Sequence, residues 1–239
     1  MAAQTIKQED FLSRKENFGG ALFYKPCSLI FFLNDEGFQL VPYIFENNLE
    51  SFEGINKLAG YFSISKEILI QDINQTKQRI ENIISSSENQ RFAEPFMPIC
   101  AQTPEQRHLI SPIFFAWEIT NKCNYNCVYC STNSSSMNSV EHSFSRERAF
   151  NIANQVIEAE IFQTFFSGGE PFKVDYLPDL VHFLTQEKRK VIVATNAALL
   201  PSLEKDLWKV KDARLQVKMD TLDKDRYNSI VETAGAFDE

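Results

Sequence analysis

The amino-acid sequence predicts an α/β protein in which a parallel sheet follows a smaller α+β region. Strand-like and helix-like segments alternate from residue 113 onward, and this alternation is typical of right-handed βαβ units. A proline-containing stretch separates the two regions, because four of the nine prolines lie between residues 95 and 112. Proline removes a backbone donor and restricts the preceding residue. We therefore expect an extended linker over residues 86–112.

The C-terminal region, residues 113–239, contains four apolar or alternating runs that predict strands. They are residues 113–119, 161–166, 190–195 and 215–219. A helix is expected after Ser145, which is a good N-cap residue, because an amphipathic stripe follows it. Further helices are expected near residues 177–184, 203–207 and 223–231. About four βα units fit this region, since an eight-unit barrel takes about 250 residues, and the fourth strand should have an exposed edge.

The N-terminal region changes character once. Residues 20–33 are aromatic and apolar, and Pro26 divides them into two short strands. Apolar residues then recur at helical spacing in three segments, near residues 38–44, 55–59 and 68–84. This order predicts a small sheet followed by three helices, an α+β, winged-helix-like module suited to binding.

The composition excludes several classes of protein. A net charge of -8 argues against non-specific nucleic-acid binding, which needs a basic surface. No apolar run approaches the roughly 20 residues that span a bilayer. The first ten residues are polar and lack the apolar stretch of a secretory signal. We predict a cytoplasmic protein with no nucleic-acid or membrane partner.

The five cysteines form a poor disulfide framework, because their number is odd and three of them fall within residues 123–130. In a reducing compartment such a cluster more often holds a metal. Cys27 falls in an apolar strand and is expected to be a core thiol. Cys100 falls in the linker.

Cys123, Cys127 and Cys130 follow the first predicted strand with C-x3-C-x2-C spacing. In parallel α/β folds, functional groups collect on loops at the carboxyl ends of strands. Three thiolates on one loop can bind three irons of a cubane cluster and leave the fourth iron open to a small molecule. The alternatives are a zinc site, with His142 or Cys100 as fourth ligand, and three unconnected thiols.

A Gly-Gly-Glu-Pro segment, residues 168–171, follows the second predicted strand. Its two glycines allow a sharp turn and the close approach of a ligand. The carboxylate of Glu170 can accept hydrogen bonds from an ammonium group. Thr195-Asn196 ends the third strand and Thr221-Leu222-Asp223 follows the fourth. Each segment alone is an ordinary strand end, so the ordered set carries the prediction.

This ordered set resembles the radical SAM superfamily, in which an aromatic residue such as Tyr129 commonly precedes the last cysteine. The resemblance implies a partial (β/α) barrel, with a [4Fe–4S] cluster on the three cysteines and S-adenosylmethionine (SAM) as the second cofactor. The residues that it assigns to SAM are Gly168, Gly169, Glu170, Asn196 and Thr221. The Gly-Gly-Glu segment would bind the methionine amino group, and the Thr221 hydroxyl would lie near the ribose. Ala197 departs from the family's Thr-Asn-Gly.

Residues 12–85 resemble the PqqD-like peptide-recognition domain, through residues 14–20, residues 33–37 and the three predicted helices. Such domains bind leader segments of ribosomally made peptides. The alternative is a generic winged-helix or dimerisation module. We expect a leader to add as a strand at residues 20–24 or 28–33. Residues 235–238 also resemble a Gly-Ser-Phe-Asp segment of peptide-modifying radical SAM enzymes.

These resemblances imply an enzyme that reductively cleaves SAM to modify a precursor peptide, with an external electron donor such as flavodoxin or ferredoxin. Radical SAM cores usually have six units, so part of the barrel is expected to be missing from residues 113–239. The alternatives are a non-catalytic peptide-binding protein and a radical SAM enzyme that acts on a small molecule.

Overall fold

The computed structural model describes residues 6–46, 48–51, 53–89, 99–100, 108–135 and 144–238. The chain divides into two compact units, Met1–Ile110 and Ser111–Glu239. Each unit has its own buried apolar clusters. No described helix combines the length and the apolar character needed to cross a membrane.

The first unit contains an antiparallel meander with one added parallel strand. Its strands are β1 (Phe11–Glu16), β2 (Gly19–Tyr24), β3 (Leu29–Leu33) and β4 (Ile99–Cys100), in the order β1-β2-β3-β4. The predicted docking edge at residues 20–24 is wrong, because β2 has a partner on each side. On β3, β4 pairs only with Leu29 and Ile30. The remaining residues of β3 keep an edge without a partner strand among the described residues.

Strand β1 is missing from the sequence-based prediction because its buried side chains include two charged ones. Arg14 and Glu16 both have side chains that are 0% exposed, with 2.6 Å between an Arg14 guanidinium nitrogen and Glu16 Oε1. Glu16 Oε2 also accepts a hydrogen bond from the backbone N–H of Ile110 at 2.8 Å. A buried charge needs a partner and full hydrogen bonding, and this arrangement provides both. The pair therefore looks polar in the sequence although it is part of the core.

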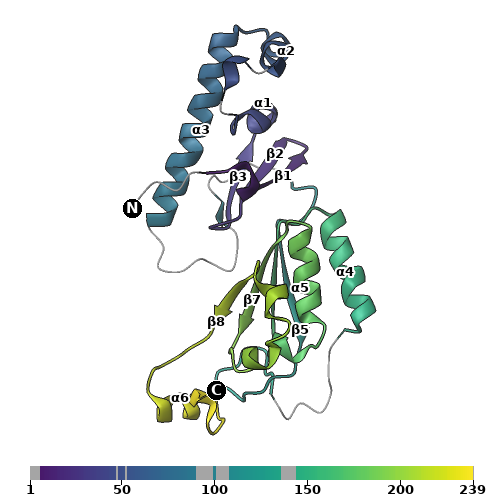
Figure 1. The fold of residues 1–239 in the computed structure, drawn as a ribbon, viewed down its shortest axis with the longest axis vertical. Coiled ribbons are helices and arrows are strands. Elements are labelled where there is room, and N and C mark those ends of the chain that lie inside the picture. Colours follow the sequence, from purple (N-terminus) through teal and green to yellow (C-terminus); the bar gives the residue numbers. More distant parts are fainter. Residues whose placement is uncertain are drawn as a thin grey trace. The chain divides into compact units, whose positions relative to one another are not determined.

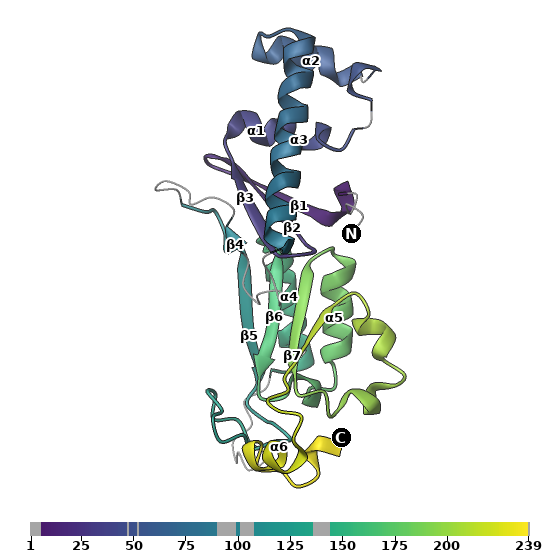
Figure 2. The ribbon, with the colours of Figure 1, turned by 90° about the vertical axis from the view of Figure 1, so that its left-hand side faces the viewer.

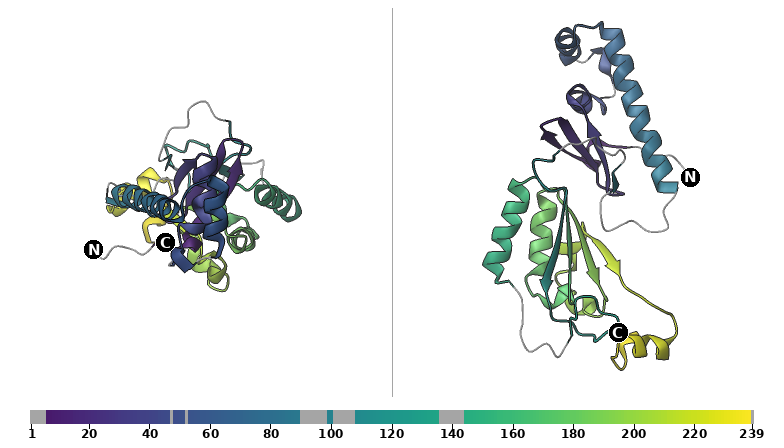
Figure 3. Two further views of the ribbon diagram at one scale, coloured as in Figure 1. Left: turned by 90° about the horizontal axis from the view of Figure 1, so that it is seen from above. Right: turned by 180° about the vertical axis from the view of Figure 1, so that it is seen from behind.

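Three helices follow β3, as predicted. They are α1 (Asp35–Leu40), α2 (Glu53–Phe62) and α3 (Lys66–Asn89). Pro42 lies in a short 3-10 turn directly after α1, where its missing N–H does no harm. Figure 3 shows α3 running past the meander. Cys27 is a buried core thiol, as predicted, but it lies in the turn between β2 and β3 and not in a strand. The side chain of Cys100 is outside what the structure describes.

The second unit is built on a parallel sheet of four strands. They are β5 (Phe114–Thr120), β6 (Gln163–Gly168), β7 (Lys190–Thr195) and β8 (Arg214–Val217), in the order β5-β6-β7-β8. All three pairings are parallel. This confirms the predicted α/β class with a parallel four-stranded sheet, consistent with a partial radical SAM core.

The helices of this unit are α4 (Arg146–Glu158), α5 (Leu177–Gln186) and α6 (Lys224–Ile230). Ser145 caps α4, as predicted, by accepting a hydrogen bond from the N–H of Arg148. The helix expected near residues 203–207 is wrong. Two 3-10 turns, Leu200–Leu203 and Leu207–Val210, occupy that region, and Pro201 at the start of the first removes a backbone donor. Figure 1 shows α4 and α5 together on one face of the sheet.

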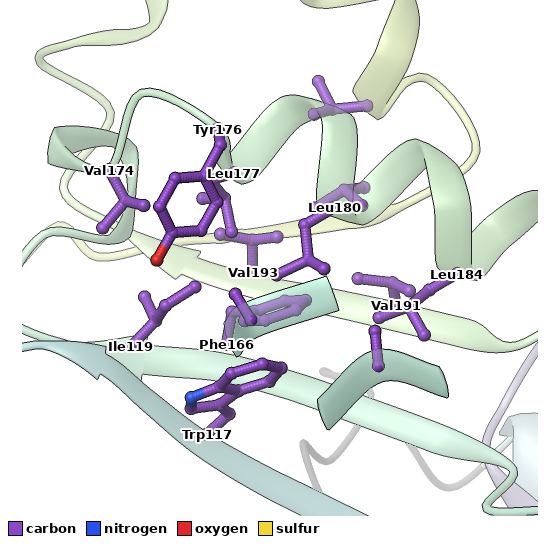
Figure 4. Packing of buried hydrophobic residues seen from close by; sticks show 14 of the residues in the cluster. Trp117, Ile119, Phe166, Val174, Tyr176, Leu177, Leu180, Leu184, Val191 and Val193 are labelled. Atoms are coloured by element: carbon purple, nitrogen blue, oxygen red, sulfur yellow. The ribbon is translucent and has the colours of Figure 1, made fainter. Parts of the chain in front are cut away.

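The core of this unit lies between the sheet and α4 and α5. Figure 4 shows Trp117, Phe166 and Val193 from three neighbouring strands beneath Leu180 and Leu184 of α5. Trp117 packs in this core, whereas Trp208 is 54% exposed. Because side chains alternate across a strand, the residues between these core positions face the opposite side of the sheet.

The outer edge of β8 has no partner strand in the part of the chain that the structure describes. Val217, Met219 and Leu222, on β8 and the segment after it, are more than half exposed. The prediction of an exposed fourth-strand edge is therefore confirmed for the described residues.

Candidate functional site

A cavity of about 530 Å³ lies at the carboxyl ends of the four parallel strands. Its walls come from the loop after β5 and from the last residues of β6, β7 and β8 with the residues that follow them. They include all three cysteines of the 123–130 loop, residues 167–170, residues 194–196 and residues 216–219. Carboxyl ends of neighbouring parallel strands meet at one edge of a sheet. The structure thus brings together segments that are up to about a hundred residues apart in the sequence.

The cysteine loop is fixed by contacts with the segment around α6. The N–H groups of Asn126 and Val128 donate to the carbonyls of Val231 and Ile230, each at 3.0 Å. The buried hydroxyl of Tyr125 donates to the carbonyl of Ala236 at 3.1 Å. In Figure 2, α6 and the segment after β5 lie together beyond the end of the sheet at which β5 and β6 finish. Residues 235–238, which resemble the Gly-Ser-Phe-Asp segment of peptide-modifying radical SAM enzymes, thus include a residue, Ala236, that holds the cysteine loop.

The three thiols have different surroundings. Burial raises the pKa of Cys123, although its sulfur accepts a hydrogen bond from the N–H of Tyr125 at 3.4 Å. Burial also acts to raise the pKa of Cys130, but hydrogen bonds from Thr132 and from the N–H of Ser134 outweigh it and lower the pKa. Ser134 donates to the Cys130 sulfur at 3.3 Å. Cys130 is therefore the better thiolate of these two.

Lys218, immediately after β8, was not predicted to belong to the site. Its ammonium donates a hydrogen bond to the sulfur of Cys127 at 3.2 Å and lies 4.3 Å from the ring centroid of Tyr129. It also pairs with Asp220 at 3.5 Å. Burial acts to lower the pKa of Lys218, but hydrogen bonds with Tyr129 and Cys127 raise it overall. Thr132 was also missed, and its hydroxyl links the loop to β6 by donating to the carbonyl of Gly168 at 3.2 Å.

Gly168, the last residue of β6, and Gly169, which follows it, are required by the close approach of the cysteine segment. A Cβ on Gly168, whose φ is +114°, would lie 2.3 Å from the carbonyl oxygen of Thr120. A Cβ on Gly169 would lie 2.0 Å from the carbonyl oxygen of Lys122. The N–H groups of Gly169 and Glu170 donate to these same two carbonyls. The close approach that glycine permits here is therefore between two protein segments, whatever ligand the cavity holds.

Glu170 connects the end of β6 to the end of β7. Its side chain is only 1% exposed but still lines the cavity. Its Oε1 accepts hydrogen bonds from the N–H of Phe172 and the hydroxyl of Thr195, and its Oε2 accepts one from the N–H of Asn196. Burial raises the pKa of Glu170 although these three hydrogen bonds act to lower it.

Asn196 and Thr221 differ in their relation to the cavity. Asn196 lines it, and its side-chain amide donates to Asn124 in the cysteine loop at 2.8 Å. Ala197 has a φ of +70°, which explains why the family commonly has glycine there. Thr221 is not among the lining residues, and its hydroxyl accepts a hydrogen bond from the N–H of Asp223. Of the predicted SAM residues, the structure brings all but Thr221 to the cavity.

The donor set at the cavity fits an iron–sulfur cluster better than a single ion. No three His, Cys, Asp or Glu side chains among the described residues are arranged to hold one metal ion. A zinc ion would draw its thiolate ligands together at about 2.3 Å from the metal, whereas a cubane binds each thiolate at a separate corner. The two zinc ligands considered above, the side chains of His142 and Cys100, lie outside what the structure describes. Backbone N–H groups already donate to the sulfurs of Cys123 and Cys130, and such hydrogen bonds are among the determinants of the potential of a cluster.

The comparison with protein families agrees with this geometry. The family described as the radical SAM superfamily matches residues 117–239, which are more than half of the chain. The chain therefore belongs to the radical SAM superfamily of enzymes, whose cofactors are a [4Fe–4S] cluster and S-adenosylmethionine.

Curated relatives include enzymes named for a small-molecule reaction. A probable GTP 3',8-cyclase of Methanococcus maripaludis is 36% identical over 126 residues, which cover 51% of this chain and 40% of the relative. The GTP 3',8-cyclase of Clostridium acetobutylicum is 25% identical over 47% of this chain and 36% of its own length. The chain thus spans less than half of the curated relatives that it matches.

Solved structures of a second protein resemble the chain over nearly its whole length. Streptococcus suis SuiB bound to S-adenosylmethionine has a TM-score of 0.60 and 20% identity, over 96% of this chain and 51% of that one. SuiB bound to precursor peptide SuiA has a TM-score of 0.59 and 17% identity. At this level of identity the likeness shows the fold.

Proposed function

We propose that Cys123, Cys127 and Cys130 bind a [4Fe–4S] cluster and that the adjoining cavity binds SAM. The observation that carries the proposal is the meeting of three thiols with the Gly-Gly-Glu segment in one cavity of about 530 Å³. When bound, the reduced cluster and SAM supply one-electron chemistry that starts with reductive cleavage of SAM.

The protein residues position the cofactors and limit the access of water. Glu170 uses three acceptor positions within the protein, and a carboxylate offers about four. One position remains for the ammonium group of SAM. Asn196 holds Glu170 through its N–H and the cysteine loop through its side chain. Gly168 and Gly169 bring the cysteine segment against β6, and both line the cavity in which SAM would bind.

Anaerobic reconstitution of the full chain tests the cluster. We expect about four irons and four sulfides per chain, and loss of both in the triple variant C123A/C127A/C130A. Cys27→Ala is the matched control, because Cys27 is a buried thiol of the other unit. Stoichiometric zinc without sulfide would contradict the proposal.

SAM binding to the reconstituted chain tests the second part. Glu170→Ala should weaken binding about ten- to a hundredfold, since a hydrogen bond to a charged group contributes about 1.5–3 kcal/mol. Thr221→Ala is the control, because Thr221 does not line the cavity. A loss of affinity in the control and none in Glu170→Ala would reverse the assignment of these residues.

We also propose that the substrate is a precursor peptide and that residues 12–85 form a PqqD-like domain that binds its leader. Two observations support this. The meander followed by three helices is the predicted order of elements, and the SuiB likeness includes this unit, since it covers 96% of the chain. The leader would add as a strand along the part of β3 that β4 does not pair with, at Phe31, Phe32 and Leu33. An external reductant such as flavodoxin or ferredoxin would supply the electron.

The competing substrate is a small molecule, because the curated relatives are named GTP 3',8-cyclases. Titrating the full chain with a labelled precursor peptide and, separately, with GTP distinguishes the two. Binding of the peptide, weakened by Phe32→Asp at the β3 edge, would support the peptide proposal. Binding of GTP alone would replace it. Failure to cleave SAM with either would favour a non-catalytic binding protein.

A further inference from the structure

Lys218 directly follows β8 and lines the cavity next to the cysteine loop. Its backbone N–H donates to the carbonyl of Thr195 at 3.0 Å, which fixes the residue to the end of β7. Its ammonium is held by the ring of Tyr129 at 4.3 Å and by Asp220 at 3.5 Å. From this position it donates to the sulfur of Cys127 at 3.2 Å. Three separate contacts therefore aim one cation at one thiol.

We propose that Lys218 is a positioning residue that raises the reduction potential of the cluster through its charged hydrogen bond to the Cys127 sulfur. The proposal rests on the proposed function, because it requires that Cys127 ligates the cluster. Reduction adds one electron from an external donor to the cluster and breaks no bond. The added negative charge spreads onto the cysteine sulfurs, where an ammonium stabilises it more than it stabilises the oxidised form. Hydrogen bonds to sulfur and net charge are known determinants of cluster potential.

The size of the effect is limited by solvent. The Lys218 side chain is 38% exposed, so water and salt screen its charge, and Asp220 offsets part of it. We expect loss of the cation to lower the equilibrium constant for reduction about tenfold, which is about 59 mV for a one-electron couple.

The test is a redox titration of the anaerobically reconstituted full chain without SAM, followed by the electron paramagnetic resonance of the reduced cluster. Lys218→Met should load iron and sulfide normally but have the lower reduction potential. The equilibrium constant for reduction of Lys218→Arg should stay within about twofold of that of the unchanged protein, because arginine keeps the charge and the donors. Lys211→Met is the matched control. It removes the same charge from an exposed residue that does not line the cavity.

If Lys218→Met fails to load a cluster, Lys218→Gln is measured instead, because it keeps an N–H donor without the charge, and its potential should lie below those of the unchanged protein, Lys218→Arg and Lys211→Met. A Lys218→Met potential equal to that of Lys211→Met would overturn the proposal, even if SAM bound more weakly. Equal lowering in Lys218→Met and Lys218→Arg would also overturn it. Absence of a cluster in the unchanged protein would instead overturn the proposed function.

Discussion

Glu170 is the residue whose removal tests the site most directly. Glu170→Ala deletes the acceptor of three hydrogen bonds of 3.1, 2.8 and 2.9 Å, donated by Phe172, Thr195 and Asn196. These bonds join the end of β6 to the end of β7. We therefore expect the substitution to reduce the stability of the unit, in addition to any effect on SAM.

The magnitude depends on which donors can find water. Phe172 and Thr195 are 6% and 4% exposed, so their donors remain unsatisfied, whereas Asn196 is half-buried and can be hydrated. A buried donor without a partner costs about 1–3 kcal/mol. Two such donors predict a loss of about 2–6 kcal/mol, a large part of the stability of an ordinary domain.

Tryptophan fluorescence during guanidinium chloride unfolding measures this loss. Both tryptophans of the sequence, Trp117 and Trp208, belong to the second unit, so the signal follows that unit alone. With an m value of about 3 kcal/mol/M, a loss of about 3 kcal/mol lowers the midpoint by about 1 M. Glu158→Ala, at an exposed position of α4, controls for the loss of a carboxylate. A midpoint unchanged from the control would refute the structural role of Glu170.

Three further results are expected. Gly169→Ala should lower the free energy of unfolding of this unit by about 1–3 kcal/mol, because the new Cβ would lie 2.0 Å from the carbonyl oxygen of Lys122; an unchanged midpoint would contradict this. Ala197→Gly should raise the free energy of unfolding by about 0.5–1 kcal/mol, since relief of a left-handed alanine exceeds the added freedom of the unfolded chain; a lower midpoint would contradict this. In the reduced, metal-free chain at pH 7.5, iodoacetamide should alkylate Cys130 before Cys123. The pKa of Cys130 is lowered and that of Cys123 is raised, so Cys130 has more thiolate. Equal alkylation rates by mass spectrometry would contradict this.

The sequence was sufficient to predict the parallel sheet and most of the cavity. Residues 190–195 form β7 with the predicted bounds, because a strand with buried side chains on both faces, as at residues 191–193, is a nearly continuous apolar run. The cysteines and the Gly-Gly-Glu segment follow strands, and the rule that carboxyl ends of parallel strands meet at one edge brings them together. Local pattern and a topological rule therefore sufficed for these residues.

Other features depend on contacts that no local pattern records. Strand β1 was missed because Arg14 satisfies Glu16 within the core. Lys218 has no motif of its own, and its role depends on Cys127, which is 91 residues earlier in the chain. Thr221 was chosen for its likeness to a family segment, but β8 ends at Val217, so the residues that reach the cavity from this strand are 216–219.

The attachment of the cysteine loop to α6 has a consequence for the order of folding. Tyr125 is held by Ala236, 111 residues later, and Asn126 is held by Val231. Contacts between such distant residues are slow to form, because the intervening chain must first be ordered. During synthesis the loop can reach its final shape only after residues 227–236 have emerged. We therefore expect the loop to mature last in this unit, after the four strands have assembled.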